Sequence, residues 1–352
     1  METAVSDVLR RRLATQGLLT DRLPSAADVV RRLACVQSQE WAHAFWSLGR
    51  RTAGATCAEV RAEFDAGSFV RTHILRPTWH FVAAEDLGWI TAITAPRVQQ
   101  LNGTIYRQYD LDQRRRDGAT ARIVEAVTGG QYRTRAELGR LLGANGVTLA
   151  YLVMNAELEG VICSGPIRGA QHTYALAAER VASPARGDLA ALAERFFIGH
   201  GPAGVKDLAR WASLTITQAT EATEAAAARL ASTTVGSEVL WFAGDSPSPP
   251  ENSPGYGALL MPLYDELTLS YPMINFPLAD RHPHPPGEDL FVGAVIVNEV
   301  NVGTWRRTVR GRKVIIEISL APGSRAAYEQ AGAAAADLAR FLGKELELTI
   351  RD

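Results

Sequence analysis

Cysteine is scarce in this 352-residue chain. Its three cysteines, Cys35, Cys57 and Cys163, are far apart and form no Cys-x-x-Cys pair, so neither a disulfide framework nor a zinc cluster is indicated. The sequence also lacks a Gly-rich phosphate loop and a motif for a nucleophilic serine or cysteine. We therefore expect a reducing compartment, no metal ion and no other cofactor.

Long hydrophobic runs are missing as well. No apolar stretch approaches the roughly 18 residues that a membrane span needs, and the N-terminus shows no basic segment followed by an apolar one. The formal net charge is only -1, so binding to nucleic acid has to come from a local basic patch rather than from overall attraction. These absences predict a cytoplasmic protein that does not bind membranes.

Helical periodicity followed by short β-prone runs is the main positive signal in the first third of the chain. Ser25 to Asp28 resembles a capping box, and the helix that it opens is predicted to end at Gln37. The elements expected after it are helices over 39–48 and 56–64 and strands over 69–73 and 78–82. Three helices followed by a hairpin is the order of a winged-helix unit.

The same order recurs twice. The second copy is expected to have helices over 120–127, 134–143 and 147–159 and strands over 161–163 and 172–176. The third is expected to have helices over 189–198, 205–211 and 215–230 and strands over 233–235 and 238–242. Capping boxes recur at matching positions, at Ser25, Thr56, Thr134 and Thr215. A repeated supersecondary unit changes the fold prediction more than any single residue does.

After a proline- and serine-rich linker the pattern turns to strands. Those expected cover 258–262, 292–297, 303–309, 314–320 and 345–350, with one helix over 326–342. We therefore predict an α+β fold of three tandem winged-helix units followed by a small, β-rich, barrel-like C-terminal domain. The predicted boundaries are 1–110, 117–183 and 187–242 for the units, 243–256 for the linker and 257–352 for the β-rich domain.

Two glutamines one residue apart, Gln37 and Gln39, are the first candidate site. A glutamine amide offers one acceptor and two donors but does not exchange a proton near neutral pH, so such a pair orients a ligand rather than acting as an acid or base. The alternative is structural: the two amides cap helix ends or bridge backbone groups at a loop.

A basic cluster near the C-terminus is the second candidate. Its five cations lie on two predicted strands that are joined by a turn near Gly311, and they are Arg306, Arg307, Arg310, Arg312 and Lys313. Such a hairpin fits a DNA groove and neutralises phosphates. The alternative is an exposed hairpin kept soluble by its charge. Arg114 to Arg116 is a weaker cluster, which flanking acids explain as a solvated linker.

Other ionisable residues favour structural roles. His282 and His284 lack the third ligand that a metal site needs, so we predict a loop. Asp265 and Glu266 could act as a general acid or base, but structural capping is favoured. His80 is expected on the first wing, as a partly buried histidine whose hydrogen bonds are satisfied.

Five segments in order resemble the AlkZ-type winged-helix DNA glycosylases. They are Val36 to Glu40 (VQSQE), Leu75 to His80 (LRPTWH), His200 to Ala203 (HGPA), Leu263 to Glu266 (LYDE) and Val302 to Arg307 (VGTWRR). The resemblance implies that Gln37 and Gln39 are catalytic and that three winged helices surround a DNA-sized cleft. A related subgroup with aspartate in the second place acts on a wider set of alkylated purines, so Gln39 indicates the crosslink-unhooking kind.

The resemblance therefore implies a monofunctional DNA N-glycosylase, which we expect to be a monomer. Its substrate is expected to be double-stranded DNA with an alkylated or crosslinked guanine, and its role DNA repair and self-resistance to azinomycin-type antibiotics. An N7-alkylguanine is already cationic and leaves as a neutral base, so neutral amides that place water and stabilise the transition state suffice. The alternatives are a non-enzymatic winged-helix transcriptional regulator and a protein-interaction scaffold.

Overall fold

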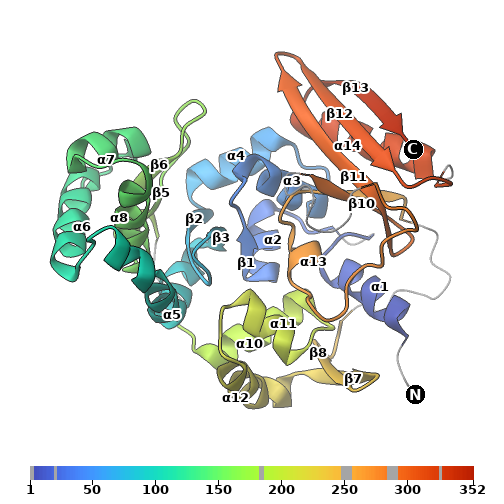
Figure 1. The fold of residues 1–352 in the computed structure, drawn as a ribbon, viewed down its shortest axis with the longest axis horizontal. Coiled ribbons are helices and arrows are strands. Elements are labelled where there is room, and N and C mark those ends of the chain that lie inside the picture. Colours follow the sequence, from blue (N-terminus) through green and yellow to red (C-terminus); the bar gives the residue numbers. More distant parts are fainter. Residues whose placement is uncertain (1–3, 20–21, 182–185, 247–255, 284–291, 325–326) are drawn as a thin grey trace.

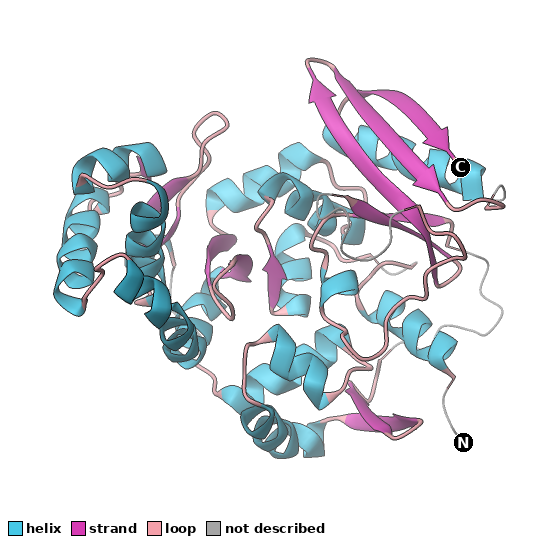
Figure 2. Ribbon diagram, in the orientation of Figure 1, coloured by secondary structure: helices cyan, strands magenta, loops and turns pink. Residues whose placement is uncertain are grey.

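The structure is a computed structural model that describes residues 4–19, 22–181, 186–246, 256–283, 292–324 and 327–352 (Figure 1). Helices predominate, and the strands of this part of the chain form four small sheets (Figure 2). None of the helices described is both long and apolar enough to span a bilayer. Most of the predicted linker over 243–256 lies outside the described residues, and so does His284.

The first repeated group follows the N-terminal helix α1 (Val5–Thr15). It consists of α2 (Ala26–Leu33), β1 (Cys35–Gln37), α3 (Trp41–Arg51), α4 (Cys57–Ala66), β2 (Phe69–His73) and β3 (Trp79–Ala83). Its strands form an antiparallel sheet of order β1-β3-β2.

The predicted extension of the second helix to Gln37 is wrong. The helix ends at Leu33, Ala34 takes a positive φ of 60°, and the next residues pair with β3 in the register Cys35↔Val82 to Gln37↔His80. All three residues of β1 are buried. Pairing with a strand more than forty residues away therefore overrides the local helical periodicity.

The second group is preceded by α5 (Leu87–Gln108), a long helix that the sequence analysis did not predict. The group comprises α6 (Gln113–Val127), β4 (Arg133–Thr134), α7 (Arg135–Leu142), α8 (Gly146–Leu158), β5 (Ile162–Ser164) and β6 (Thr173–Leu176). Arg114 to Arg116 lie in the first turn of α6 rather than in a linker. The helix begins there because the Asp112 carboxylate accepts the Arg115 N–H at 2.7 Å and caps it.

The third group repeats the order once more, after the short helix α9 (Ala177–Arg180). It comprises α10 (Leu189–His200), α11 (Val205–Trp211), α12 (Ile216–Ala226), β7 (Ala231–Val235) and β8 (Glu238–Phe242). A bridge between Ala203 and Trp241 takes the place of the first strand. The order helix, strand, two helices, two strands thus occurs three times, while the predicted unit boundaries stay a prediction.

Capping explains where several of these helices begin. Reciprocal capping boxes form at Thr56, Thr134 and Thr215. At Ser25 the Asp28 N–H donates to the Ser25 hydroxyl at 3.1 Å, and that hydroxyl donates to Oδ2 of Asp28 at 2.7 Å. The bond from the Ser25 backbone N–H to the Asp28 side chain, which would complete the box, is not formed. Three of the four predicted boxes are therefore complete.

The C-terminal sheet has the order β13-β12-β11-β10-β9 and is open, so the barrel-like prediction is wrong. Its elements are β9 (Ala258–Met261), α13 (Glu266–Leu269), β10 (Gly293–Val297), β11 (Val300–Arg310), β12 (Lys313–Leu320), α14 (Ala327–Leu342) and β13 (Glu345–Arg351). The last strand runs parallel to β12, which requires a crossover, and α14 provides it. Helix α14 thus covers the apolar face of the sheet that barrel closure would otherwise bury. The sequence predicted one helix in this domain, and α13 is a second.

The first group lies at the centre of the molecule and shares its core with two other parts (Figure 1). Trp46 of α3, Trp305 of β11 and Phe341 of α14 belong to one apolar cluster, and the Trp46 indole N–H donates to the Leu260 carbonyl at 2.8 Å. A second cluster joins Cys35 and Val82 to helices α10 to α12. Strand β1 is therefore positioned by the third group as well as by its own sheet.

Candidate active site

The two glutamines lie where β1 ends. Gln37 is the last residue of this edge strand, opposite His80, and Gln39 precedes α3. Gln37 is 7% exposed, whereas Gln39 is half-buried. The Gln37 Oε1 atom is buried and has no hydrogen-bond partner among the described residues. Buried acceptors are nearly always paired, so this atom lacks a hydrogen bond that a water or a ligand could supply.

The backbone of residues 37–39, here called the glutamine segment, is held from both sides. The Gln37 N–H donates to Oε1 of Glu266 at 2.7 Å, and the Ser38 N–H donates to the Trp79 carbonyl at 2.8 Å. Arg71 donates from Nε to the Ser38 carbonyl at 3.0 Å and from Nη2 to the Gln39 carbonyl at 3.2 Å. All four contacts use main-chain atoms of the segment, so they fix its path and leave its side chains free.

Arg71 lies in the middle of β2 and is almost fully buried. Burial lowers the pKa of Arg71 to about 10, so the guanidinium stays charged at neutral pH. It packs over the Trp79 ring at 4.2 Å, and its own backbone N–H donates to the Ser164 hydroxyl of the second group at 2.8 Å. A charged residue in the middle of a β-prone run was the sequence signal for this role, and sequence reasoning missed it.

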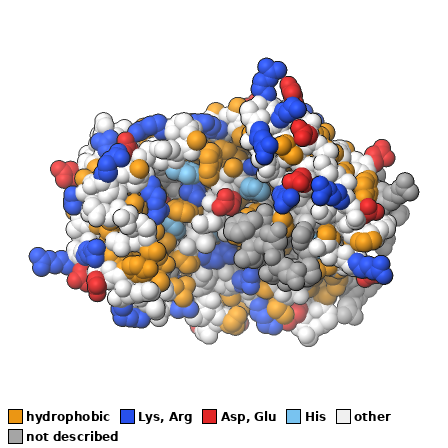
Figure 3. All heavy atoms as spheres, turned by 45° about the horizontal axis from the view of Figure 1, so that its top comes forward, with side chains coloured by type: hydrophobic (Ala, Val, Ile, Leu, Met, Phe, Trp, Pro, Cys, Tyr) orange, Lys and Arg blue, Asp and Glu red, His pale blue; other side chains and the backbone are white. Residues whose placement is uncertain are grey.

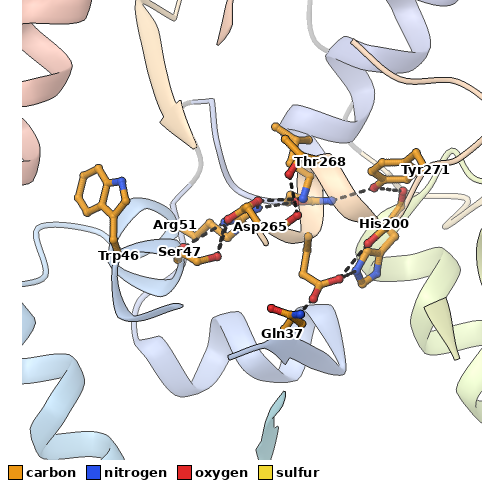
Figure 4. Close-up of polar contacts among 12 residues, drawn as sticks. Gln37, Trp46, Ser47, Arg51, His200, Asp265, Thr268 and Tyr271 are labelled. Carbon is orange, nitrogen blue, oxygen red and sulfur yellow. Dashed lines mark hydrogen bonds and ion pairs between the residues drawn. The ribbon is translucent and has the colours of Figure 1, made fainter. Parts of the chain in front are cut away.

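Glu266 approaches the glutamine segment from α13. Its Oε2 atom accepts hydrogen bonds from the Trp211 indole at 3.1 Å and from the Ser270 hydroxyl at 2.9 Å, and His200 Nε2 lies 3.4 Å away. Figure 4 shows Gln37 and His200 reaching the same carboxylate. Burial alone would raise the pKa of Glu266, but the contact with His200 and nearby positive charge lower it to about 2. The group is therefore a carboxylate.

The neighbouring Asp265 has a structural role, as predicted. It accepts two bonds from the Arg51 guanidinium, at 2.7 and 2.8 Å, and one from the Ser47 hydroxyl at 2.6 Å (Figure 4). It also caps α13 by accepting the Leu267 N–H at 2.8 Å. Asp265 is 1% exposed and Glu266 fully buried, so the geometry gives neither a path to a substrate as a general acid or base.

His80, opposite Gln37, is a fully buried histidine with both nitrogens engaged. Nδ1 lies 3.0 Å from the Thr78 carbonyl, and Nε2 lies 3.3 Å from Nη2 of Arg76. Burial, and after it the charge of Arg76, lowers the pKa of His80 to about 3. The prediction that its hydrogen bonds are satisfied is confirmed, whereas the expected partial burial is wrong because the ring is fully enclosed. The ring is neutral at physiological pH.

The basic cluster divides into an inner and an outer part. Arg307 is half-buried against α3 and donates from Nη2 to the Ala42 carbonyl at 2.7 Å, three residues beyond Gln39. The other four lie along the exposed part of the hairpin. Three of them have acidic partners, in the pairs Arg306–Glu317 at 2.9 Å, Arg312–Glu345 at 3.5 Å and Lys313–Glu347 at 3.5 Å. Figure 3 shows basic and acidic side chains interspersed over this projecting tip.

Within the described ranges, no three His, Cys, Asp or Glu side chains are arranged to hold a metal ion. His282 lies in the predicted loop, with its ring nitrogen Nε2 3.2 Å from Oδ1 of Asn301. The three cysteines are free thiols, and Cys35 and Cys163 are buried.

Comparison with known proteins places this geometry in context. The family model described as DNA glycosylase AlkZ-like matches residues 30–341. An interstrand DNA cross-link repair glycosylase of Streptomyces sahachiroi is 27% identical over 236 residues, a match that covers 62% of this chain and 62% of the relative. The solved structure of the Streptomyces sahachiroi DNA glycosylase AlkZ superposes with a TM-score of 0.79 at 21% identity, over 99% of this chain and 100% of that one. At this identity the structural likeness concerns the fold.

Proposed function

Because the chain belongs to the AlkZ-like family of DNA glycosylases, we propose that it hydrolyses the N-glycosidic bond of cationic N7-alkylguanine in double-stranded DNA. We also propose that it unhooks interstrand crosslinks, since the relative from Streptomyces sahachiroi is named for cross-link repair. The family resemblance further supports a role in DNA repair and in self-resistance to azinomycin-type antibiotics. The family itself was predicted correctly from the sequence.

One observation carries the proposed chemistry. The two side-chain amides of the glutamine segment are neutral, and charged groups hold the main chain of that segment in place. Gln37 offers an uncommitted acceptor, the Gln39 side chain is half-buried, and His80 beside them is neutral. Hydrolysis of a nucleoside bond passes through an oxocarbenium-like sugar, as glycoside hydrolysis does. A normal purine needs an acid to assist its departure, whereas an N7-alkylguanine leaves as a neutral base. A site whose two glutamine side chains are neutral suits the second kind of substrate.

The two amides are assigned different parts of the reaction. Oε1 of Gln37 accepts a hydrogen bond from the attacking water and so directs its lone pair at the anomeric carbon. The more exposed Gln39 donates from its amide to the sugar or to a phosphate. The contact of Gln37 strengthens as the attacking water becomes more acidic, which is the condition for lowering a barrier rather than only binding the substrate. The contact of Gln39 holds the sugar or phosphate in position for that attack.

DNA binding is assigned to the hairpin of β11 and β12. Its outer cations, Arg306, Arg310, Arg312 and Lys313, contact phosphates, and Arg307 lies between that surface and the glutamine segment. We take the three repeated groups to be winged-helix units that surround the duplex, and the enzyme to act as a monomer.

Base excision from an N7-methylguanine duplex tests the proposal. We expect Gln37→Ala and Gln39→Ala each to slow single-turnover excision on the order of 10²-fold, because the water or the sugar is then no longer held in position. DNA affinity should stay within about twofold, and Gln100→Ala, which changes an exposed glutamine of α5, should excise normally.

Other outcomes would count against the proposal. Normal excision by both glutamine variants would exclude the catalytic assignment. Sequence-specific DNA retention by the wild type without abasic sites would indicate the alternative, a non-enzymatic transcriptional regulator.

A further inference from the structure

A carboxylate from the C-terminal part of the chain reaches the glutamine segment. Glu266 on α13 and Gln37 on β1 are 229 residues apart in sequence, yet Oε1 of Glu266 accepts the Gln37 N–H at 2.7 Å. The other oxygen of the same carboxylate binds Trp211 of α11 and Ser270. One buried side chain therefore joins the first group, the third group and the C-terminal part at the position of Gln37.

The pairing of β1 explains why Gln37 needs this acceptor. In an antiparallel pair, alternate residues turn their N–H groups away from the partner strand. The Ser38 N–H donates to the carbonyl of Trp79, the first residue of β3, so the N–H of Gln37 points away from β3. Among the described residues, no strand pairs with β1 on that side. A buried N–H without a partner is costly, and a charged acceptor makes the bond about twice as strong as a neutral one.

Glu266 is itself held in one orientation. Asp265 caps the short helix α13 and is fixed by Arg51, so the backbone next to Glu266 is anchored. The indole of Trp211 and the hydroxyl of Ser270 then hold Oε2, which leaves Oε1 directed at Gln37. The carboxylate has little freedom to move without releasing several bonds together.

We propose that Glu266 is a positioning residue for the glycosylase reaction. It holds the main chain of Gln37 so that the side-chain amide of Gln37 meets the attacking water in a single orientation. This inference rests on the proposed function. Its physical basis is that a displacement of about 1 Å at a reacting group costs on the order of 10²-fold in rate. Glu266 touches no substrate and transfers no proton in this role.

The test compares Glu266→Gln with a matched variant, Asp86→Asn. Asp86 is also a buried carboxylate that accepts an indole N–H, from Trp89 at 2.9 Å, and it also joins the first group to the third, through Arg195 at 2.9 Å. It does not contact the glutamine segment. A glutamine at position 266 has a single acceptor oxygen. It therefore cannot accept from the Gln37 N–H and also from the Trp211 and Ser270 donors.

Two readouts are measured on the full-length chain. Hydrogen exchange at the backbone N–H of Gln37 should become at least about tenfold faster in Glu266→Gln and stay unchanged in Asp86→Asn. Single-turnover excision of N7-methylguanine should fall about 100-fold in the first variant only, with DNA affinity within about twofold in both. A merely structural role would lower stability in both variants and would not separate them in the excision step.

Trp211→Phe and Trp89→Phe form a second matched pair, which serves if Glu266→Gln fails to fold. Each removes one indole donor from a buried carboxylate, and only the first should speed exchange at Gln37 and slow excision. If the backbone N–H of Gln37 exchanges as slowly in Glu266→Gln and Trp211→Phe as in the wild type, Glu266 does not anchor Gln37. Faster exchange with normal excision would overturn the positioning role. A wild type that excises nothing refutes the proposed function, while the exchange data still decide whether Glu266 anchors Gln37.

Discussion

Replacing Arg71 by lysine tests whether the rigid backbone beneath the two glutamines matters for the reaction. The guanidinium of Arg71 binds two successive carbonyls, those of Ser38 and Gln39, and stacks on Trp79. A lysine ammonium is a point charge without the planar fork, so it serves one carbonyl and stacks less well. Arg71→Lys therefore keeps the charge and removes about half of the attachment.

The geometry allows the two effects to be estimated. Loss of one hydrogen bond from a charged donor costs about 1.5 to 3 kcal/mol of unfolding free energy, and the weaker contact with the Trp79 ring adds about 0.5 kcal/mol or more. If the segment is then free to shift by about 1 Å, excision slows by about 100-fold. That factor corresponds to about 2.7 kcal/mol of barrier.

Arg180 provides the matched control. Its Nη2 atom also donates to two successive carbonyls, those of Phe64 at 2.8 Å and Asp65 at 2.9 Å, at the end of α4. Arg180→Lys should lose less stability in urea denaturation, because a lysine ammonium can serve two carbonyls that one nitrogen served before, and it should excise N7-methylguanine at the wild-type rate. If both variants slow excision equally, or if Arg71→Lys loses stability but not rate, the reasoning about a positioned backbone is refuted.

Three further variants test other parts of the structure. Arg310→Gln with Arg312→Gln should weaken DNA binding and lower the slope of log affinity against log salt by about 1.8, at about 0.9 per lost phosphate contact; an unchanged slope argues against the hairpin. Gly49→Ala puts its Cβ 2.1 Å from the Phe341 ring and should cost about 1 to 3 kcal/mol in chemical denaturation. Burial lowers the pKa of His172 to about 3, so its contribution to stability is present above pH 6.5 and lost toward pH 3; His172→Phe should lose less stability between pH 7 and pH 4.5.

Local signals account for the parts of the fold that were predictable. Capping boxes at Thr56, Thr134 and Thr215 each depend on residues within one helical turn, and each forms where the sequence places it. The alternation along β12 likewise reports a strand with one buried face. Such features can be read from the sequence because the interacting groups are neighbours in the chain.

The errors arose where distant segments decide the outcome. The residues before Gln37 continue a helical pattern, but pairing with β3 makes them a strand. The open C-terminal sheet depends on α14 crossing over to place β13 beside β12, which strand periodicity does not reveal. The acidic partners of the basic cluster, Glu317, Glu345 and Glu347, become apparent only once the strand register is known.

The candidate site shows the same division. The family resemblance singled out Gln37 and Gln39, and their catalytic role stays a proposal, but the groups that hold them were not found as such. Glu266 was considered only as an acid, a base or a cap, and Arg71 was not considered. Both act on main-chain atoms, which every residue has, so no side-chain pattern at positions 37–39 points to them.

Because the glutamine segment is attached through its main chain, its conformation does not depend on the side chains proposed to act in the reaction. The four bonds that hold it involve the N–H groups of Gln37 and Ser38 and the carbonyls of Ser38 and Gln39, whereas the half-buried Gln39 side chain makes no hydrogen bond with the described residues. Gln39→Asp should therefore unfold within about 0.5 kcal/mol of the wild type, because nothing that positions the segment is removed. Excision of several alkylated purines, measured beside urea denaturation, then reports the effect of a carboxylate in place of an amide. A large loss of stability in this variant would show that the side chain, and not only the backbone of residue 39, holds the segment in place.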